Sequence, residues 1–560
     1  MNGTVAPSSK QTSTLASWCL AGEMAVAGIV YSRCLGNAFV FDDLPEIVYN
    51  RYLGNWSFLW KSFASDGWWF VDPNHLPQSS YYRPLLDVWL WLNYHLFGLH
   101  ASGWHAAMVA LHLIVVWLAY RTASLLADDQ WTGVLAAGLF GLMPIHAQAV
   151  IWPAAISYPL CAAFELAAFE FYLHAADEPN SRRTLAISLG FFGGALLTYE
   201  GAVTFPFLIA AHAWIVSSSP DRMRRTFAAI TPYAVEFAAY FILRFAVLGF
   251  IARPYLENHM TAWEIILTLP AVVASYAAML AIPWMAAPTH RIDTVHAIGD
   301  PAFYFPLLGL AVASVALFLL FRNHPRRKLY LFSAAWILSA LAPMLNIGQL
   351  QDQLSIQDRY LYLASFGVCL FAADLAVSFA RLSERRANAV WIGAGIVAVC
   401  YALALYWVQG YWRDEVSLFS RCVEIAPDVG PWHSRLGLAL EDRGDYRDAR
   451  PELERAIALD PYTQGNVYYD LGLINEKLGD AKAAAHWMAE GLKRYDRPPP
   501  IAYTDVAIAQ DAAGDTAAAE ETLRQAEKLP GGKETAAMAR AQIRFLHGDK
   551  AGAESGLRTL

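Results

Sequence analysis

The stretch LASWCLAGEMAVAGIVYSRCL at residues 15–35, followed at residues 39–45 by FVFDDLP, decides how this chain folds. The first segment has the length of a helix that crosses a bilayer, which needs about 20 predominantly apolar residues. The second segment places two adjacent carboxylates, Asp42 and Asp43, just beyond that helix. Ionised groups beside a bilayer are costly and mark functional sites by default. The two segments predict a membrane span with a candidate reactive site at its outer end.

The composition indicates a membrane domain and a second, polar domain. Of the 560 residues, 56% are hydrophobic and 16% are charged, which is too apolar for a water-soluble chain. Residues 411–560 nevertheless hold 44 of the 90 Asp, Glu, Lys and Arg residues. We therefore expect a membrane domain over residues 1–410, with an outer loop at 36–102, and a soluble domain over 411–560. The net charge of −8 gives no indication of nucleic acid as a partner.

Apolar segments predict about eleven membrane-spanning helices. Residues 184–217 form an apolar block that Thr198-Tyr199-Glu200 interrupts, which predicts two short spans with a polar turn. The other nine segments are residues 15–35, 103–126, 131–150, 154–175, 226–250, 302–321, 328–347, 359–380 and 389–409. We expect that the first span is not removed as a signal peptide, because no convincing small-residue cleavage site precedes the loop that carries Asp42 and Asp43. We call this loop, residues 36–102, the acidic loop.

Residues 263–282 are also apolar, and the basic clusters decide whether they cross. All the clusters between Arg182 and Arg386 can be cytoplasmic only if this segment does not span, so we expect an interfacial or re-entrant helix. The N-terminus is then cytoplasmic. The loop 36–102 and the chain beyond Gly410 share the outer face, which would be periplasmic for a protein of the inner membrane.

The polar domain carries an internal repeat. Gly-Asp recurs at residues 444–445, 479–480, 514–515 and 548–549, with spacings of 35, 35 and 34 residues, close to the tetratricopeptide period of about 34. Small residues keep the same phase at Ala449, Ala484, Ala519 and Ala553. Stacked helix pairs of this kind bury a shared core and leave a concave binding surface. The domain is predicted to be an α-solenoid that recognises proteins.

Asp42 and Asp43 are the leading candidates for a catalytic base. A positioned carboxylate can take a proton from a hydroxyl. Neighbouring side chains diverge by about 100° on a helix and about 180° on a strand, so one of the two should face a site. The other can cap or orient a helix that begins near Pro45, and for the pair as a whole capping is the open alternative.

Arg83 and Arg359 are candidates for holding a phosphate. They lie in YYRPL at residues 81–85 and in DRYLYL at residues 358–363, and a guanidinium fork binds phosphate oxygens in a bidentate way. The structural alternative is an arginine that reaches from a helix end to the interface. For Arg359, an ion pair with Asp358 is a further alternative.

Other side chains at the outer ends of the spans are candidates for binding a sugar or an acceptor. Aromatic rings form platforms for sugars but also interfacial belts, and a single His at a helix end is more often structural. The candidates are Tyr82, Trp68, Trp69, His146, Gln148 and Glu200. There is no nucleotide-sugar signature and no metal-ligand spacing. We therefore expect no required cofactor or metal, with a divalent ion left open.

The order of these motifs resembles that of the transmembrane and tetratricopeptide-repeat O-mannosyltransferases and their bacterial relatives, which have the C-type membrane glycosyltransferase fold. The matching stretches cover nearly the whole chain: Phe39–Asn50, residues 82–85, Gly103–His112, Pro144–Trp152, Asp358–Leu363, Trp412–Pro427 and the repeats. The resemblance implies a polyprenyl-phosphate-linked sugar donor, a protein hydroxyl as acceptor, and Asp42 as the catalytic base. Where the family has His-Pro-Val-His-Val-Glu, this chain has Met143 for the first His and Gln148 for the Glu. Glu200 is a candidate substitute for that Glu.

The sequence thus predicts an all-α protein, a polytopic bundle followed by a repeat solenoid. Its predicted function is to move a mannose-like hexose from a polyprenyl phosphate to a Ser or Thr hydroxyl at the outer face. The donor, the membrane lipid and an acceptor protein bound by the repeats are the expected partners. Two alternatives stay open: a membrane-anchored repeat scaffold without catalysis, and a transferase acting on a lipid or a polysaccharide.

Overall fold

The computed structural model describes residues 9–71, 79–177, 182–216, 221–250, 260–347, 354–460, 463–495 and 498–558. These residues are predominantly helical and divide into two compact units, Met1–Asp414 and Glu415–Leu560. We call them the membrane unit and the repeat unit. The predicted all-α class, a membrane bundle followed by a helical repeat, is confirmed.

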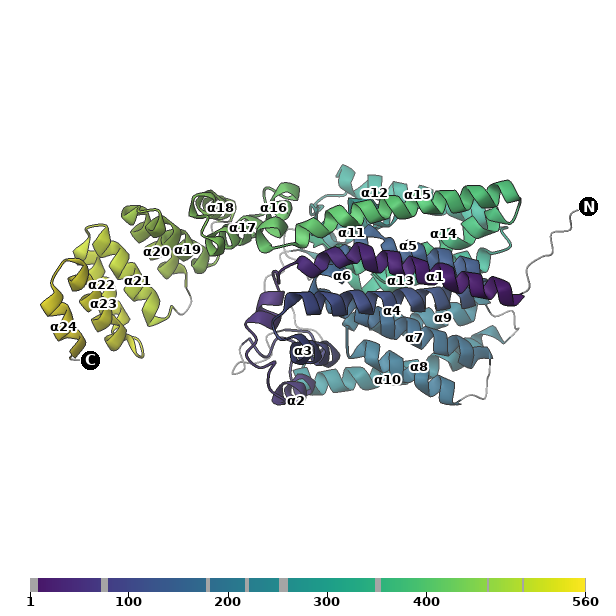
Figure 1. Ribbon diagram of the computed structural model, residues 1–560, viewed down its shortest axis with the longest axis horizontal. Coiled ribbons are helices and arrows are strands. Elements are labelled where there is room, and N and C mark those ends of the chain that lie inside the picture. Colours follow the sequence, from purple (N-terminus) through teal and green to yellow (C-terminus); the bar gives the residue numbers. More distant parts are fainter. Residues whose placement is uncertain are drawn as a thin grey trace, which may run out of the picture. The chain divides into compact units, whose positions relative to one another are not determined.

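The membrane unit contains fifteen α-helices and one two-stranded antiparallel sheet within its described residues. The α-helices are α1 (Ser9–Tyr31), α2 (Ser57–Ala64), α3 (Pro84–Phe97), α4 (Ala101–Ala127), α5 (Gln130–Leu142), α6 (Ala147–Ile151), α7 (Ser157–Asp177), α8 (Arg182–Leu196), α9 (Phe205–Val216), α10 (Arg222–Leu248), α11 (Ala262–Ala281), α12 (Pro301–Phe321), α13 (Arg327–Leu341), α14 (Ala364–Ala380) and α15 (Glu384–Gln409). Strand β1 (His290–Ile292) pairs with β2 (Leu354–Ile356). In Figure 1 the long helices α1, α4 and α15 run side by side, and α2 and α3 lie at one end of them.

Eight helices in the described residues are long and apolar enough to cross a membrane, or nine if the bent pair α5 and η3–α6 counts as one span. This criterion counts only long helices, whereas the predicted total of about eleven spans includes two short ones; the shorter apolar helices Glu200–Val216 and Ala364–Ala380 come in addition. The apolar block 184–217 forms α8 and α9, of 15 and 12 residues, and α14 has 17, all shorter than the ~20 residues that a bilayer needs. Conversely, α11, which we expected not to cross, is among the eight.

Prolines end helices at the face of the bundle where the acidic loop lies. The residue before a proline is pushed out of helical geometry, and both Met143 and Trp152 are extended, with ψ of 120° and 109°. The bend between α5 and the segment Pro144–Ile151 is 55°. Short helical turns follow: η3 (Pro144–His146), α6 and η4 (Pro153–Ile156). The break at Pro153 leaves the backbone N–H of Ala154 free of the helix, and Asp43 of the acidic loop accepts it.

The loop between α1 and α3 is folded around its own core. Ile47, Leu53 and Phe58 are almost completely buried, and Trp69 is 6% exposed. Within this loop lie η1 (Ser32–Gly36), the π-helical turn η2 (Leu44–Val48) and α2. This core packs on α3 and the start of α4.

In its described residues the repeat unit consists of α16 (Glu415–Ile425) and four antiparallel helix pairs. The pairs are α17 (Gly430–Arg443) with α18 (Tyr446–Leu459), α19 (Gly465–Lys477) with α20 (Ala481–Arg494), α21 (Pro500–Ala512) with α22 (Thr516–Ala526), and α23 (Gly532–Leu546) with α24 (Lys550–Arg558). The glycine of each Gly-Asp turn has φ between +82° and +89°, a conformation that glycine adopts without penalty. At Gly472 a Cβ atom would lie 2.4 Å from Met488 Cγ. The Gly-Asp and small-residue positions that define the repeat in the sequence are thus the positions of the helix turns and helix crossings in the structure.

Candidate active site

The acidic pair lies on a tight turn whose backbone is unusual. Phe41 has φ of +55°, which is a genuine outlier for a bulky residue and is found where surrounding structure enforces it. Its ring stacks on Trp152 at 5.6 Å between centroids, and Trp152 Nε1 donates to the carbonyl of Val40. The turn is therefore held in place by the break between α6 and α7.

Asp43 is the structural member of the pair. Its carboxylate is fully buried. One oxygen accepts the backbone N–H of Val40 at 3.0 Å, and the other accepts that of Ala154 at 2.8 Å. The side chain does not cap the following helix η2, as one alternative predicted. It ties the acidic loop to the start of η4 instead.

Asp42, in contrast, is only half-buried. Burial opposes the charge of Arg359, but Tyr158, Tyr360 and the Asp42 carboxylate raise the pKa of this arginine above its ordinary value. On the other side, burial raises the pKa of Glu46 well above its usual range, and Asp42 contributes to that shift. Asp42 therefore lies within electrostatic reach of both a guanidinium and a second acid.

Arg83 is held in one orientation by Glu200. The guanidinium Nε donates to Glu200 Oε2 at 2.8 Å, and the backbone N–H of Tyr82 donates to Oε1 at 3.0 Å. Its guanidinium carbon lies 4.1 Å from the ring centre of Tyr81 and 4.9 Å from that of Tyr199. Burial disfavours the charge, but Glu200 and the neighbouring tyrosines raise the pKa of Arg83 above its ordinary value. The effect of Glu200 on the site is thus to orient the Arg83 guanidinium.

Arg359 is surrounded by rings and amides. It lies in the turn η9 (Asp358–Leu361), and its Nε is 3.4 Å from the Tyr158 hydroxyl. The rings of Trp152 and Tyr360 lie 5.1 and 5.2 Å from its guanidinium carbon. Within the described residues, no carboxylate oxygen lies within 4.0 Å of a guanidinium nitrogen of Arg359. Its Nη1 donates to Gln357 Oε1 at 3.3 Å, so the hydrogen bonds that this guanidinium makes in the described part of the chain are to neutral groups.

The neighbouring Asp358 fixes this turn rather than pairing with Arg359. Its Oδ2 accepts the backbone N–H of Ala287 and its Oδ1 lies 2.7 Å from His290 Nε2. Burial raises the pKa of Asp358, and the hydrogen bond with His290 opposes the shift. The ion pair of Asp358 with Arg359, one alternative drawn from the sequence, is not formed.

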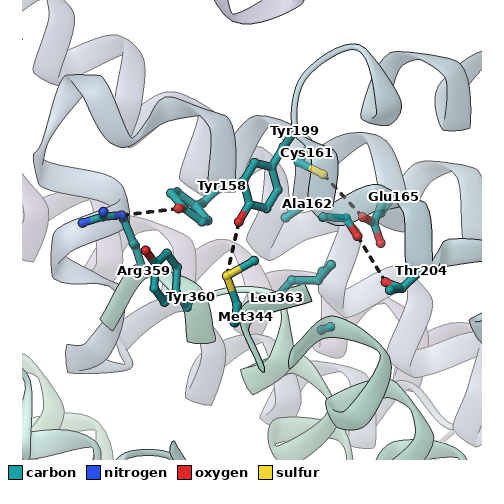
Figure 2. A pocket seen from close by; sticks show the side chains of 12 residues that line it. Tyr158, Cys161, Ala162, Glu165, Tyr199, Thr204, Met344, Arg359, Tyr360 and Leu363 are labelled. Atoms are coloured by element: carbon teal, nitrogen blue, oxygen red, sulfur yellow. Dashed lines mark hydrogen bonds between the residues drawn. The ribbon is translucent and has the colours of Figure 1, made fainter. Parts of the chain in front are cut away.

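The two arginines flank one pair of tyrosines. Arg83 contacts Tyr199, Arg359 contacts Tyr158, and the two rings lie 4.9 Å apart. Tyr158, Tyr199 and Arg359 line a narrow pocket with about 30 Å³ of enclosed space, between α7, α13 and the turns η5 (Glu200–Thr204), η7 (Ala342–Leu345) and η9 (Figure 2). The structure thus brings Asp42, Arg83, Arg359 and Glu200 to one region, at the end of the bundle where the loop between α1 and α3 lies.

Gln148 lies in this region, where its side chain holds neighbouring groups in place by hydrogen bonds. Its Oε1 accepts the backbone N–H of Arg359 at 3.0 Å, and its Nε2 donates to Gln357 Oε1 and to the carbonyl of Pro288. A carboxylate only accepts hydrogen bonds, so a Glu at this position would face two oxygen atoms. This geometry gives a physical reason for Gln where the family has Glu.

The remaining candidates lie in packed surroundings. His146 is fully buried, with Nε2 2.7 Å from the Ser365 hydroxyl. Tyr82 is 1% exposed and donates its hydroxyl to the carbonyl of Phe63. Trp69 belongs to the core of the acidic loop and Trp68 packs against that core. None of these four side chains lines the pocket beside Arg359.

Sequence reasoning did not single out Tyr158, Tyr199 and Tyr360 as site residues. Tyr158 and Tyr360 are adjacent to predicted helix ends and Tyr199 lies in the polar turn before Glu200, so their position at the interface was the available signal. Burial raises the pKa of Tyr360 to about 12, against the opposing charge of Arg359. In the described part of the chain, no three His, Cys, Asp or Glu side chains are grouped so that they could hold a metal ion.

The fold and the repeats define a multi-pass membrane protein that carries a tetratricopeptide-repeat unit; the model of the tetratricopeptide repeat family matches residues 434–497. The predicted resemblance to the transmembrane and tetratricopeptide-repeat O-mannosyltransferases is confirmed by two relatives. Protein O-mannosyl-transferase F38B6.6 of Caenorhabditis elegans is 28% identical over 77% of this chain and 61% of its own length. Protein O-mannosyl-transferase TMTC4 of Homo sapiens is 24% identical over 76% of this chain and 64% of its own length. The chain thus spans about three fifths of the length of these curated relatives.

Among solved structures, ArnT from Cupriavidus metallidurans bound to undecaprenyl phosphate is 17% identical. The match has a TM-score of 0.40 and covers 86% of this chain and 81% of ArnT.

Proposed function

We propose that this protein is a membrane glycosyltransferase that moves a mannose-like hexose from a polyprenyl phosphate to a Ser or Thr hydroxyl of a protein. The observation that carries the proposal is the packing of the turn that bears Asp42 beside Arg359: the Phe41 ring stacks on Trp152 at 5.6 Å, and the Trp152 ring lies 5.1 Å from the Arg359 guanidinium carbon. Among the described residues, no carboxylate oxygen lies within 4.0 Å of a nitrogen of this guanidinium. The similarity to protein O-mannosyltransferases supports the choice of sugar and acceptor.

The proposed step balances as follows. Asp42 takes the proton of the acceptor hydroxyl, and the hydroxyl oxygen attacks the anomeric carbon of the sugar. The bond between that carbon and the phosphate oxygen breaks, and the phosphate leaves with the electron pair. Displacement from the opposite face inverts the configuration at the anomeric carbon.

The arginines hold the leaving group in this scheme. Arg359 and Arg83 bind phosphate oxygens, and their positive charge stabilises the negative charge that grows on the phosphate as it leaves. Glu200 orients Arg83, and Gln148 fixes the backbone of Arg359. Asp43 holds the turn that presents Asp42. The step requires no cofactor beyond the lipid-linked donor.

The proposed setting is the inner membrane, with the acidic loop and the repeats on the outer side. The basic clusters all lie on the cytoplasmic side in this orientation only when α11 does not cross the bilayer, so the proposal includes an α11 that does not cross although its length and apolarity would allow it to. Tetratricopeptide-type solenoids offer concave surfaces for peptides, so the repeat unit is proposed to recognise the acceptor protein.

The test is replacement of Asp42 by Asn at the native locus, with envelope glycopeptides compared by mass spectrometry at matched protein levels. Loss of hexose from specific peptides is the expected result. The control is Asp293→Asn, which removes an exposed carboxylate bound to Arg291 in the same unit. An unchanged glycopeptide profile in Asp42→Asn cells, when deletion of the gene still causes a defect, would favour the scaffold alternative.

A further inference from the structure

The turn η10 (Gly410–Trp412), which follows the last helix of the membrane unit, is in contact with the candidate active site. Trp412 is 3% exposed, and its ring stacks on that of Trp152 with centroids 5.4 Å apart and planes at 28°. The carbonyl of the next residue, Arg413, accepts the backbone N–H of Ala38 at 2.9 Å. The end of the membrane unit is thus fixed both to Trp152 and to the acidic loop.

Trp152 is the side chain through which the two halves of the site touch. Its ring stacks on Phe41, the residue before Asp42, and its Nε1 donates to the carbonyl of Val40 at 3.3 Å. The guanidinium carbon of Arg359 lies 5.1 Å from the same ring. Because packed interiors transmit displacements, a shift of this indole moves both the turn that bears Asp42 and the guanidinium of Arg359.

Stacking, and not a hydrogen bond, holds the Trp412 ring against Trp152. The Nε1 of Trp412 is buried and has no hydrogen-bond partner in the part of the chain that the structure describes. A buried indole N–H usually finds an acceptor, so the position of this ring comes with an unpaired donor. We therefore expect that a flat apolar ring without an N–H supports Trp152 as well as the indole does.

We propose that Trp412 is a positioning residue for sugar transfer: by supporting the ring of Trp152, it fixes the distance between Asp42 and Arg359. This inference rests on the proposed function, in which Asp42 takes the acceptor proton and Arg359 holds the donor phosphate. Reacting groups must be held in a close and aligned geometry, and a misplacement of about 1 Å caused by a distant mutation can lower the rate about 100-fold. Trp412 stands three residues before the repeat unit begins at Glu415, so the end of the membrane unit supports the site and is not a mere linker.

The first test compares two substitutions of Trp412 in the purified full-length protein in detergent. Trp412→Phe keeps a flat ring, whereas Trp412→Leu keeps apolar volume without one. The donor is polyprenyl-phosphate mannose, and the acceptor is a peptide that loses hexose in Asp42→Asn cells. We expect Trp412→Leu to lower kcat by about 10- to 100-fold and Trp412→Phe to stay within about twofold of the wild type.

Binding of bare polyprenyl phosphate separates the donor site from turnover. Its dissociation constant is taken from the ligand-dependent rise of Tm. Trp412→Leu should weaken this binding by about 2- to 10-fold, the range for one aromatic contact, whereas Trp412→Phe should leave it unchanged. A folded Trp412→Leu protein with wild-type kcat and lipid affinity would overturn the inference. Equal impairment of the two variants would overturn it as well.

Trp391→Leu is the matched control. Trp391 lies on α15, 18 residues and about 27 Å along the helix axis before the end of that helix. Its ring pairs with that of Trp131 at a centroid distance of 5.4 Å, the same as for Trp152 and Trp412. The substitution therefore removes an aromatic pair of the same spacing far from the site, and it should leave kcat and lipid binding unchanged.

A second readout needs no substrate. In hydrogen exchange followed by mass spectrometry, the peptides that contain Val40 and Ala154 report how firmly the acidic turn is held, because both N–H groups bond to Asp43. Exchange there should be several-fold faster in Trp412→Leu than in the wild type, and unchanged in Trp412→Phe and Trp391→Leu. Wild-type exchange in Trp412→Leu would contradict the support of the turn by Trp412.

Failure of the proposed function gives a different pattern. If the wild-type protein neither binds polyprenyl phosphate nor transfers sugar, the proposed reaction fails whatever the substitutions do. Faster exchange of the turn in Trp412→Leu alone would then still establish that Trp412 positions the acidic pair.

Discussion

Replacing Asp43 by Asn tests the division of labour between the two adjacent acids. The Asp43 carboxylate is fully buried and accepts two backbone N–H groups, those of Val40 and Ala154, one on each oxygen. An Asn side chain offers one oxygen, and its NH₂ group would face the other N–H. Leaving a buried donor unsatisfied costs about 1–3 kcal/mol, and converting the remaining bond from charged to neutral costs about 1 kcal/mol more. We therefore expect a loss of roughly 2–4 kcal/mol in the stability of the membrane unit.

The assay is thermal unfolding of the full-length protein in detergent, followed by tryptophan fluorescence. Asp42→Asn is the matched control, since it removes the same charge one residue away from a side chain that is only half-buried. Asp43→Asn should lower Tm by several degrees, whereas Asp42→Asn should leave Tm close to that of the wild type and abolish sugar transfer. A wild-type Tm for Asp43→Asn, or equal destabilisation by the two substitutions, would refute the assignment of the structural role to Asp43.

Three other predictions concern separate parts of the molecule. Gln148→Glu places a carboxylate against two oxygen acceptors, so Tm should fall and the KM for the donor should rise; a fully active, equally stable variant would contradict the role given to the amide. Gly472→Ala puts a Cβ 2.4 Å from Met488 Cγ, which should cost about 1–3 kcal/mol in chemical denaturation of the repeat unit, and a neutral effect would show that the helices can move apart. Burial raises the pKa of Asp87 from 3.8 to about 7, so between these values the folded protein binds more protons than the unfolded chain and stability falls as pH rises. Tm should thus decline from pH 5 to pH 8 in the wild type and decline less in Asp87→Asn, while parallel profiles would argue against a buried neutral acid.

The repeat unit was largely predictable, because its architecture depends on local rules. A glycine that must adopt positive φ and a small residue at each helix crossing recur with the period of the repeat. The four Gly-Asp turns accordingly fall at the helix turns, and the phased alanines at positions 449, 484, 519 and 553 are buried. Each repeat contacts mainly its neighbours, so short-range sequence information is sufficient.

The membrane unit was predictable in class but less so in detail. Apolar length identifies helices, and the block 184–217 forms two short helices separated by the polar turn at Thr198-Tyr199-Glu200, as predicted. Proline-induced breaks at residues 144 and 153 bend or end helices in ways that hydropathy does not register. From the basic clusters we predicted that α11 does not cross the membrane, whereas its length and apolarity match those of the other spans.

By itself the sequence determined the helical class and the repeat period, because composition and periodicity are properties of the chain. It also led to the prediction that an acidic pair and two arginines form the site. Only the tertiary structure decided which acid is structural, since this depends on the N–H of Ala154, far along the sequence from Asp43. It also decided that Glu200 reaches Arg83 and that Tyr158 and Tyr199 lie between the arginines. Long-range contacts of this kind arise from the packing of helices whose order in space the linear pattern does not specify. The site is therefore assembled by the fold from residues that the sequence can only nominate one at a time.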